Sequence, residues 1–146
     1  MSDKKTILVV EDTESLSNVL KSELSQDGFE VITASNGEEG LTMADEKHPD
    51  LILLDIVMPE MDGMTMYKKL RESAWGRDAL VIVLTNLPAK FSQEFSEILK
   101  ADGVEYVVKL DTEITDIVAK VKQKLGITEE QVMPTPEIPE DPTAIA

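Results

Sequence analysis

Short apolar runs alternate along the chain with stretches whose apolar residues have helical spacing. The runs are rich in β-branched residues and predict five strands, at residues 6–10, 30–34, 50–54, 79–84 and 104–108. Apolar residues three and four positions apart predict a helix after each strand. The residues that mark these helices are Leu16, Val19, Leu20 and Leu24; Gly40, Leu41 and Ala44; Met66, Tyr67 and Leu70; Phe91, Phe95, Ile98 and Leu99; and Ile114, Ile117, Val118, Val121 and Leu125. Gly126 is predicted to end the last helix, which completes five strand–helix units.

Three of the predicted strands, at 6–10, 50–54 and 79–84, are almost continuously apolar instead of alternating with polar residues. This pattern is typical of strands that are covered on both faces, as in a parallel sheet. Alternating strands and helices with short connections then imply right-handed crossovers. The sequence therefore predicts an α/β fold with a doubly wound parallel sheet in a three-layer sandwich.

Length and composition indicate one domain followed by a tail. The 146 residues are near the commonest size of a single domain, and 42% are apolar, so one hydrophobic core is expected. From Ile127 onward the chain holds four of the seven prolines and five acidic residues but no basic residue. We predict a domain at 1–126 and an extended, mobile, acidic and proline-rich tail or linker at 127–146.

The charge and the residues that are missing exclude several classes of function. With 14 Lys and Arg against 29 Asp and Glu, the net charge is −15, which disfavours direct binding to nucleic acid or to anionic lipid. The absence of cysteine excludes disulfides, thiolate zinc sites and a thiol nucleophile. No apolar run approaches the roughly 18–20 residues of a membrane span, and the first residues lack the layout of a signal peptide. We therefore expect a cytoplasmic protein without membrane insertion.

Polar side chains follow four of the predicted strands. Glu11 and Asp12 follow the first strand, Asp55 the third, Thr85 the fourth and Lys109 the fifth. Each of these residues alone is more commonly a turn or helix-cap residue. The carboxyl ends of parallel strands, however, converge on one crevice of such a sheet. The shared position therefore predicts a site with three carboxylates, a hydroxyl and an ammonium group.

Three neighbouring carboxylates repel one another unless a cation neutralises them or one of them takes up a proton. Oxygen ligands at an open position suit Mg²⁺, and Mn²⁺ is an acceptable substitute. With Lys109 supplying further positive charge, an incoming phosphoryl group would find its oxygens matched by the cation, the ammonium group and the hydroxyl of Thr85. Asp55 is then the expected nucleophile.

At these same residues the chain resembles the receiver domain of two-component response regulators, over roughly residues 4–125. The matching segments occur in order: ILVVED with Glu11 and Asp12, LILLDIVMPEMDG with Asp55, VIVLT with Thr85, and YVVK with Lys109. The resemblance implies a flavodoxin-like sandwich with strand order 2-1-3-4-5.

The resemblance also implies a role for each site residue. Asp55 would accept the phosphoryl group; Asp12, Asp55 and the backbone carbonyl of Val57 would bind Mg²⁺ directly; and Glu11 would act through water. Thr85, Lys109 and the backbone amides of Val57 and Asn86 would contact the phosphoryl group. Thr85 and Tyr106 would form the switch that alters the face made by the fourth helix, the fifth strand and the fifth helix.

The implied partners are proteins. The phosphoryl donor in such a family is a sensor histidine kinase or a phosphotransfer protein, and the switched face would act on a downstream protein target. No effector domain follows the predicted domain, so we expect a single-domain response regulator. It would catalyse its own phosphoryl transfer and a slow self-dephosphorylation without being an enzyme in the usual sense.

The chain departs from the family pattern at several positions. Leu110 stands where the family has a proline that follows a cis peptide bond. A cis bond before leucine costs about 3–4 kcal/mol, so we expect a trans bond here. We also expect a shift of the loop that carries Lys109. Asn86 replaces a small residue beside Thr85. Val57 and Leu87 are apolar where relatives have polar residues that orient the hydrolytic water, which predicts a long-lived phosphoaspartate.

Two alternative functions remain open at this stage. A degenerate receiver, used only for protein docking without phosphorylation, is consistent with Leu110 and Asn86. A Mg²⁺-dependent phosphatase with an aspartyl nucleophile is less favoured, because such enzymes commonly have a second Asp two residues after the first, where this chain has Val57.

Overall fold

Helices and strands alternate along the chain in a computed structural model that describes residues 4–56, 63–85, 97, 100–109 and 112–127. In chain order, the elements are β1 (Thr6–Val10), α1 (Glu14–Gln26), β2 (Glu30–Ala34), α2 (Gly37–Lys47), β3 (Leu51–Asp55), α3 (Gly63–Glu72), a 3₁₀ turn (Gly76–Asp78), β4 (Val81–Thr85), β5 (Glu105–Val108) and α5 (Ile114–Lys124). The predicted fourth helix, around Phe91, Phe95, Ile98 and Leu99, and residues 128–146 of the predicted tail lie outside the described residues.

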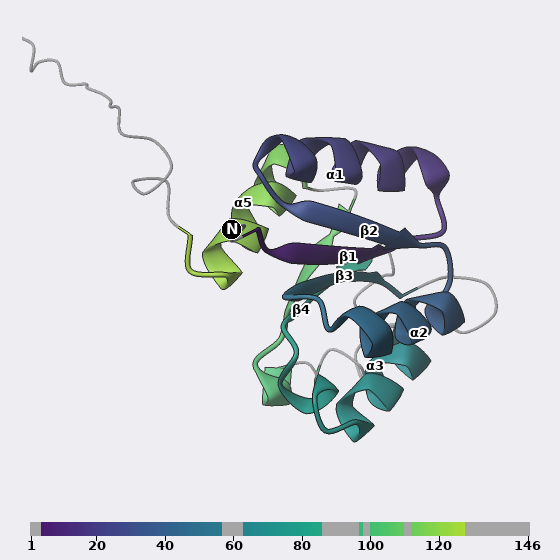
Figure 1. Cartoon of the computed structure of the whole chain (residues 1–146). Coiled ribbons are helices and arrows are strands. Elements are labelled where there is room, and N and C mark those ends of the chain that lie inside the picture. The colour runs from purple at the N-terminus through teal and green to yellow at the C-terminus, as the bar shows by residue number, and fades with distance from the viewer. Residues whose placement is uncertain (1–3, 57–62, 86–96, 98–99, 110–111, 128–146) are drawn as a thin grey trace, which may run out of the picture.

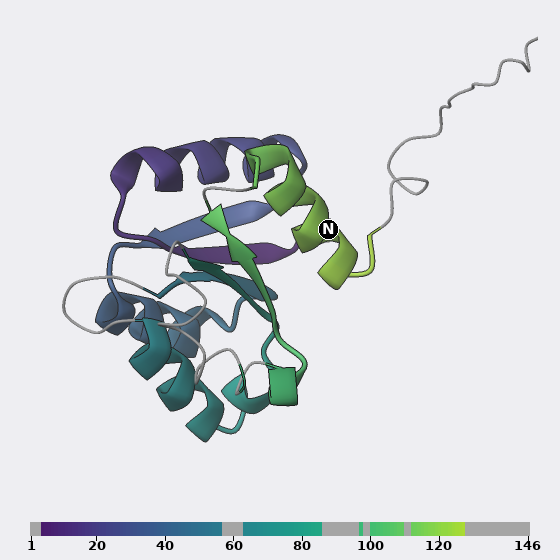
Figure 2. The same ribbon diagram turned by 180° about the vertical axis from the view of Figure 1, so that it is seen from behind.

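The five strands form one parallel sheet in the order β2-β1-β3-β4-β5. Helices α1 and α5 cover one face of the sheet, and α2 and α3 cover the other (Figures 1 and 2). The prediction of a doubly wound, flavodoxin-like sandwich with this strand order is therefore confirmed. Because the strand order reverses beside β1, the carboxyl ends of β1 and β3 border the crevice where such folds bind ligands.

The continuous apolar runs of the central strands are explained by burial on both faces. In β1, Ile7 and Val9 pack into the cluster under α1 and α5, whereas Leu8 and Val10 pack into the cluster under α2 and α3. All four are fully buried. A strand that contributes to two cores needs an apolar residue at every position, and the sequence pattern reflects this requirement.

The strands at 6–10 and 30–34 have the predicted bounds, and the other three are shifted by one or two residues at their ends. The predicted strands at 50–54 and 79–84 stop too early, because the backbone pairing continues past the last apolar residue. Asp55 pairs with Leu84, and Thr85 pairs with Val108. Two of the predicted site residues are therefore the last residues of strands instead of the first residues of loops. This places them on the rigid sheet.

The predicted helix stop is also confirmed. Gly126 has a φ of 79°, a left-handed conformation that glycine adopts without steric cost, and it follows α5 directly after Leu125. Among the described residues, no helix is long and apolar enough to cross a membrane.

Candidate functional site

An acidic cluster lies at the carboxyl ends of β1 and β3. Glu11, Asp12 and Asp55 each place one carboxylate oxygen within 4.8 Å of the others. Glu11 and Asp55 are only 2% and 3% exposed, whereas Asp12 is exposed to solvent. The cluster arises because neighbouring parallel strands end at the same edge of the sheet, as the sequence predicted.

Lys109 reaches this cluster from the end of β5. Its Nζ lies 3.0 Å from Glu11 Oε1, 3.2 Å from Glu11 Oε2 and 3.4 Å from Asp55 Oδ2. The ammonium group therefore stands at the acids although Leu110 replaces the family's proline. Leu110 itself and the bond before it lie outside the described residues. The sequence predicted that Lys109 would reach the site but did not indicate that its nearest partner is Glu11.

Backbone contacts hold Glu11 in place. Its amide donates to the carbonyl of Ala34 at 3.0 Å, which continues the pairing of β1 with β2 beyond the strand. Its Oε2 also accepts a hydrogen bond from the amide of Thr13 at 3.1 Å. The carboxylate is therefore fixed both by the turn that follows β1 and by the ammonium group of Lys109.

Gly63, the first residue of α3, lies against the backbone of Asp55. Its amide donates to the carbonyl of Ile56 at 2.8 Å. A Cβ at this position would lie 2.1 Å from the carbonyl oxygen of Asp55 and 2.7 Å from the Cα of Ile56. Only glycine allows α3 to begin this close to the end of β3, so this residue helps to position the Asp55 backbone.

The charges at the site do not balance. Three carboxylates face one ammonium group among the described residues, which leaves an excess of negative charge in a largely buried location. The donor atoms are oxygens only, and one of the three acids is open to solvent. This donor set fits a hard divalent cation such as Mg²⁺, which keeps several water ligands and takes few carboxylates from the protein.

The remaining predicted site residues are less completely described. Thr85 ends β4, and its backbone pairs with Val108, next to Lys109. Tyr106 lies in β5 opposite Val83; it is partly buried and packs against the cluster under α2 and α3. The backbone groups of Val57 and Asn86, which were expected to contact the metal or the phosphoryl group, lie outside the described residues.

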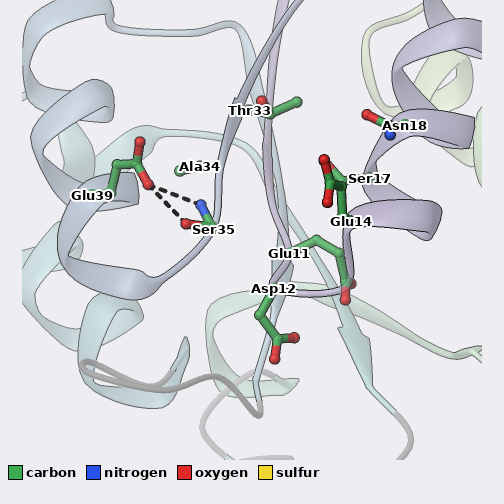
Figure 3. Close-up of a pocket in the computed structure, with 9 residues that line it drawn as sticks. All are labelled: Glu11, Asp12, Glu14, Ser17, Asn18, Thr33, Ala34, Ser35 and Glu39. Atoms are coloured by element: carbon green, nitrogen blue, oxygen red, sulfur yellow. Dashed lines mark hydrogen bonds between the residues drawn. The ribbon is translucent and has the colours of Figure 1, made fainter.

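A surface cavity of about 360 Å³ adjoins the acidic cluster, between α1 and the start of α2 (Figure 3). Besides Glu11 and Asp12, its lining includes Ser17 and Glu39. Sequence reasoning missed this cavity. A signal was available, because Ser17 is a polar residue that shares the buried face of α1 with Leu20 and Leu24.

The family model described as "Response regulator receiver domain" matches residues 7–122, which is most of the chain. The chain belongs to this family. Receiver domains generally accept a phosphoryl group in two-component signalling, where they interact with histidine kinases and downstream effectors. The resemblance that the strand-end residues suggested is thereby confirmed.

Curated relatives of this receiver domain are longer proteins. The "Probable transcriptional regulator ycf27" of Cyanophora paradoxa is 37% identical over 133 residues, which are 91% of this chain and 53% of that protein. The alkaline phosphatase synthesis transcriptional regulatory protein PhoP of Bacillus subtilis is 42% identical over 95 residues, 65% of this chain and 37% of that protein. The chain thus spans about half or less of these relatives.

Solved structures share the fold of this receiver domain. A CheY-like receiver domain protein from Methanospirillum hungatei superposes with a TM-score of 0.75 at 28% identity, covering 89% of this chain and 98% of that one. The response regulator TrrA from Thermotoga maritima, solved in complex with Mg(2+)-BeF, has a TM-score of 0.66 at 34% identity and covers 84% of this chain and 96% of that one.

Proposed function

We propose that the chain accepts a phosphoryl group on Asp55 from a histidine kinase or a phosphotransfer protein, with Mg²⁺ at the acidic cluster. The observation that carries the proposal is the arrangement of Asp55, a buried carboxylate that has Glu11 and Asp12 within 4.8 Å and the ammonium group of Lys109 at 3.4 Å. The bound TrrA structure supports the choice of cation, because that relative holds Mg²⁺ together with BeF.

Asp55 and Lys109 would have different roles in the transfer of the phosphoryl group. An Asp55 oxygen forms the new bond to phosphorus while the bond between phosphorus and the donor nitrogen breaks, and the electron pair leaves with the donor imidazole. Lys109 already lies between Glu11 and Asp55, so its ammonium group can move from one carboxylate to the phosphoryl oxygens over a short distance. Asp12 and Asp55 directly, and Glu11 through water, would hold Mg²⁺, which would supply positive charge that lowers the repulsion between the carboxylates and the phosphoryl oxygens.

Four further contacts belong to the proposal on the strength of the family. The carbonyl of Val57 would complete the metal ligands, and the amides of Val57 and Asn86 would donate to the phosphoryl oxygens. The hydroxyl of Thr85 would contact the phosphoryl group from the end of β4, next to the strand that carries Lys109 and Tyr106. Tyr106 would then change its packing on the core and alter the surface around β5 and α5.

The test is to incubate the protein with Mg²⁺ and a small acyl phosphate and to measure its mass. A single phosphoryl adduct is expected in the wild type and is expected to be absent in Asp55→Asn. Asp116→Asn is a matched control, because Asp116 is an exposed aspartate in the first turn of α5 that does not belong to the acidic cluster. That variant should form the adduct as the wild type does.

The same experiment separates the proposal from its alternatives. An unmodified wild-type protein would favour a docking module that is not phosphorylated. Release of many phosphate equivalents per chain, lost in Asp55→Asn, would favour an aspartyl phosphatase. The apolar side chains of Val57 and Leu87 predict that the adduct decays slowly, and a decay within seconds of removing the donor would contradict this.

A further inference from the structure

The cavity beside the acidic cluster shares Glu11 and Asp12 with that cluster, and its polar lining extends beyond the residues of phosphoryl transfer. Four carboxylates line it, and no Lys, Arg or His is among its lining residues. The lining also includes the hydroxyl and amide side chains of Ser17, Asn18, Thr33 and Ser35. Such a lining offers many hydrogen-bond acceptors and a strongly negative potential, and both features select a cation with several donor groups.

Ser17 is a second observation that points to a ligand. The residue is only 8% exposed, and it lines the cavity from the buried side of α1. Within the described part of the chain, no group forms a hydrogen bond with its hydroxyl, whereas its amide donates to the carbonyl of Thr13 at 2.9 Å. Buried hydroxyl groups almost always have a partner, so this hydroxyl favours a polar group inside the cavity.

The two other acids of the cavity face it from different elements. Glu14 lies in the first turn of α1 and is exposed. Glu39 lies in the first turn of α2, where its Oε1 accepts hydrogen bonds from the amide and the hydroxyl of Ser35, both at 3.1 Å (Figure 3). Glu39 is therefore held in position, and a cation between α1 and α2 would meet carboxylates on both sides.

We propose that this cavity receives an arginine side chain of a protein that docks on the face between α1 and α2. A guanidinium group fits better than an ammonium group, because it is planar, carries five donors and is more weakly hydrated. The volume of about 360 Å³ is at the low end of ligand pockets, about 300–1,000 Å³, and accommodates a long side chain.

The shape of the cavity favours a side chain over a free small molecule. Five of its nine lining residues are exposed, namely Asp12, Glu14, Asn18, Ser35 and Glu39. The site is thus a surface depression, whereas small-molecule sites bury about 70–90% of the ligand. A side chain that is anchored by its own protein needs no such enclosure. The net charge of −15 also favours a basic partner surface.

The proposal goes beyond phosphoryl transfer and does not depend on it. The test uses N-acetyl-arginine amide as the probe and backbone amide NMR of the full chain as the readout. Shifts are expected at Ser17, Asn18, Thr33 and Ser35, and they should be absent with N-acetyl-citrulline amide, the neutral analogue of similar shape. Asp55→Asn should bind the probe as the wild type does, so a failure of phosphorylation and a failure of this site are distinguishable.

Two substitutions of cavity acids and one control define the site. Glu14→Gln and Glu39→Gln should each weaken the binding of the arginine probe about two- to fivefold. Glu38→Gln should leave it unchanged, because Glu38 is an exposed neighbour of Glu39 in α2 that does not line the cavity. Ser17→Ala should also weaken binding about two- to fivefold, with an unchanged midpoint of urea unfolding.

Three results would overturn the proposal. The first is equal binding of the arginine and citrulline probes, and the second is equal binding of N-acetyl-lysine amide, which would remove the preference for guanidinium. The third is a loss of affinity in Glu38→Gln as large as in Glu39→Gln, which would show that the probe senses only the overall charge of the chain.

Discussion

Replacing Lys109 by methionine should destabilise the protein far more than the same replacement at Lys122. Both lysine side chains are similarly covered, at 14% and 13% exposed, and both pair with acids. The partners differ. The side chains of Glu11 and Asp55, beside Lys109, are 0% and 4% exposed, whereas the side chain of Asp27, which lies 3.4 Å from Lys122, is 35% exposed.

The expected magnitude follows from this difference. The Coulomb attraction between unit charges 3.0 Å apart, as for Lys109 and Glu11, is about 5 kcal/mol at an effective dielectric constant of 20, before the cost of desolvation. Removing one partner of a buried pair typically costs about 3–5 kcal/mol, because the other charge stays buried without compensation. A partly exposed pair such as Lys122 with Asp27 contributes about 0–1 kcal/mol. We therefore expect the two variants to differ by at least about 2 kcal/mol.

The assay is urea unfolding followed by the fluorescence of Trp75, the single tryptophan of the chain, in the presence of a chelator. Addition of Mg²⁺ should restore part of the stability of Lys109→Met, because a divalent ion bound at the acids replaces the missing positive charge. Equal losses of unfolding free energy in Lys109→Met and Lys122→Met would refute the reasoning. An absence of any recovery with Mg²⁺ would contradict the metal assignment alone.

Three further predictions concern neighbouring features of the fold. Gly63→Ala should lower the free energy of unfolding by about 3 kcal/mol, the upper end of overpacking costs, because the added Cβ would meet the backbone of Asp55. A free energy of unfolding, measured with urea, within about 1 kcal/mol of the wild-type value would show that α3 can move away. Burial raises the pKa of Tyr67, and the hydrogen bond to Asp102 raises it further. The stability that the neutral phenol contributes is therefore fully present below the unfolded-state pKa of about 10, and it is lost as the pH rises through the higher folded-state pKa. Urea midpoints of Tyr67→Phe should therefore fall less steeply in this alkaline range than those of the wild type, and parallel curves would speak against this. Asp12→Asn should weaken Mg²⁺ binding measured by calorimetry about tenfold or more, whereas unchanged affinity would remove Asp12 from the ligand set.

Much of the fold could be predicted because its signals are local. The strands at 6–10 and 30–34 have the predicted bounds, since runs of β-branched residues identify strands from neighbouring positions alone. The ends of β3 and β4 were placed too early, because Asp55 and Thr85 are polar and their pairing depends on strands far away in the sequence. A hydrophobicity pattern cannot report a backbone ladder that continues through polar residues.

Contacts between side chains of helices and turns that lie outside the predicted site could not be predicted from the sequence. His48 has a left-handed φ of 45°, and its ring stacks on that of Trp75 at a centroid distance of 4.3 Å. Trp75 also donates to Asp45 at 3.1 Å. These residues belong to α2, to its end and to the turn after α3, and only the packing of α2 against α3 brings them together.

The sequence by itself determined the class of fold, the edge of the sheet where the acids and Lys109 lie together and the residue types present there. These features follow from the order of apolar and polar positions, since parallel strands necessarily end side by side. Tertiary structure decided which charges pair, with Lys109 nearest to Glu11, and it created the cavity above the buried hydroxyl of Ser17. Distances of a few ångströms between side chains depend on how helices and strands pack in three dimensions, and no one-dimensional pattern contains that information.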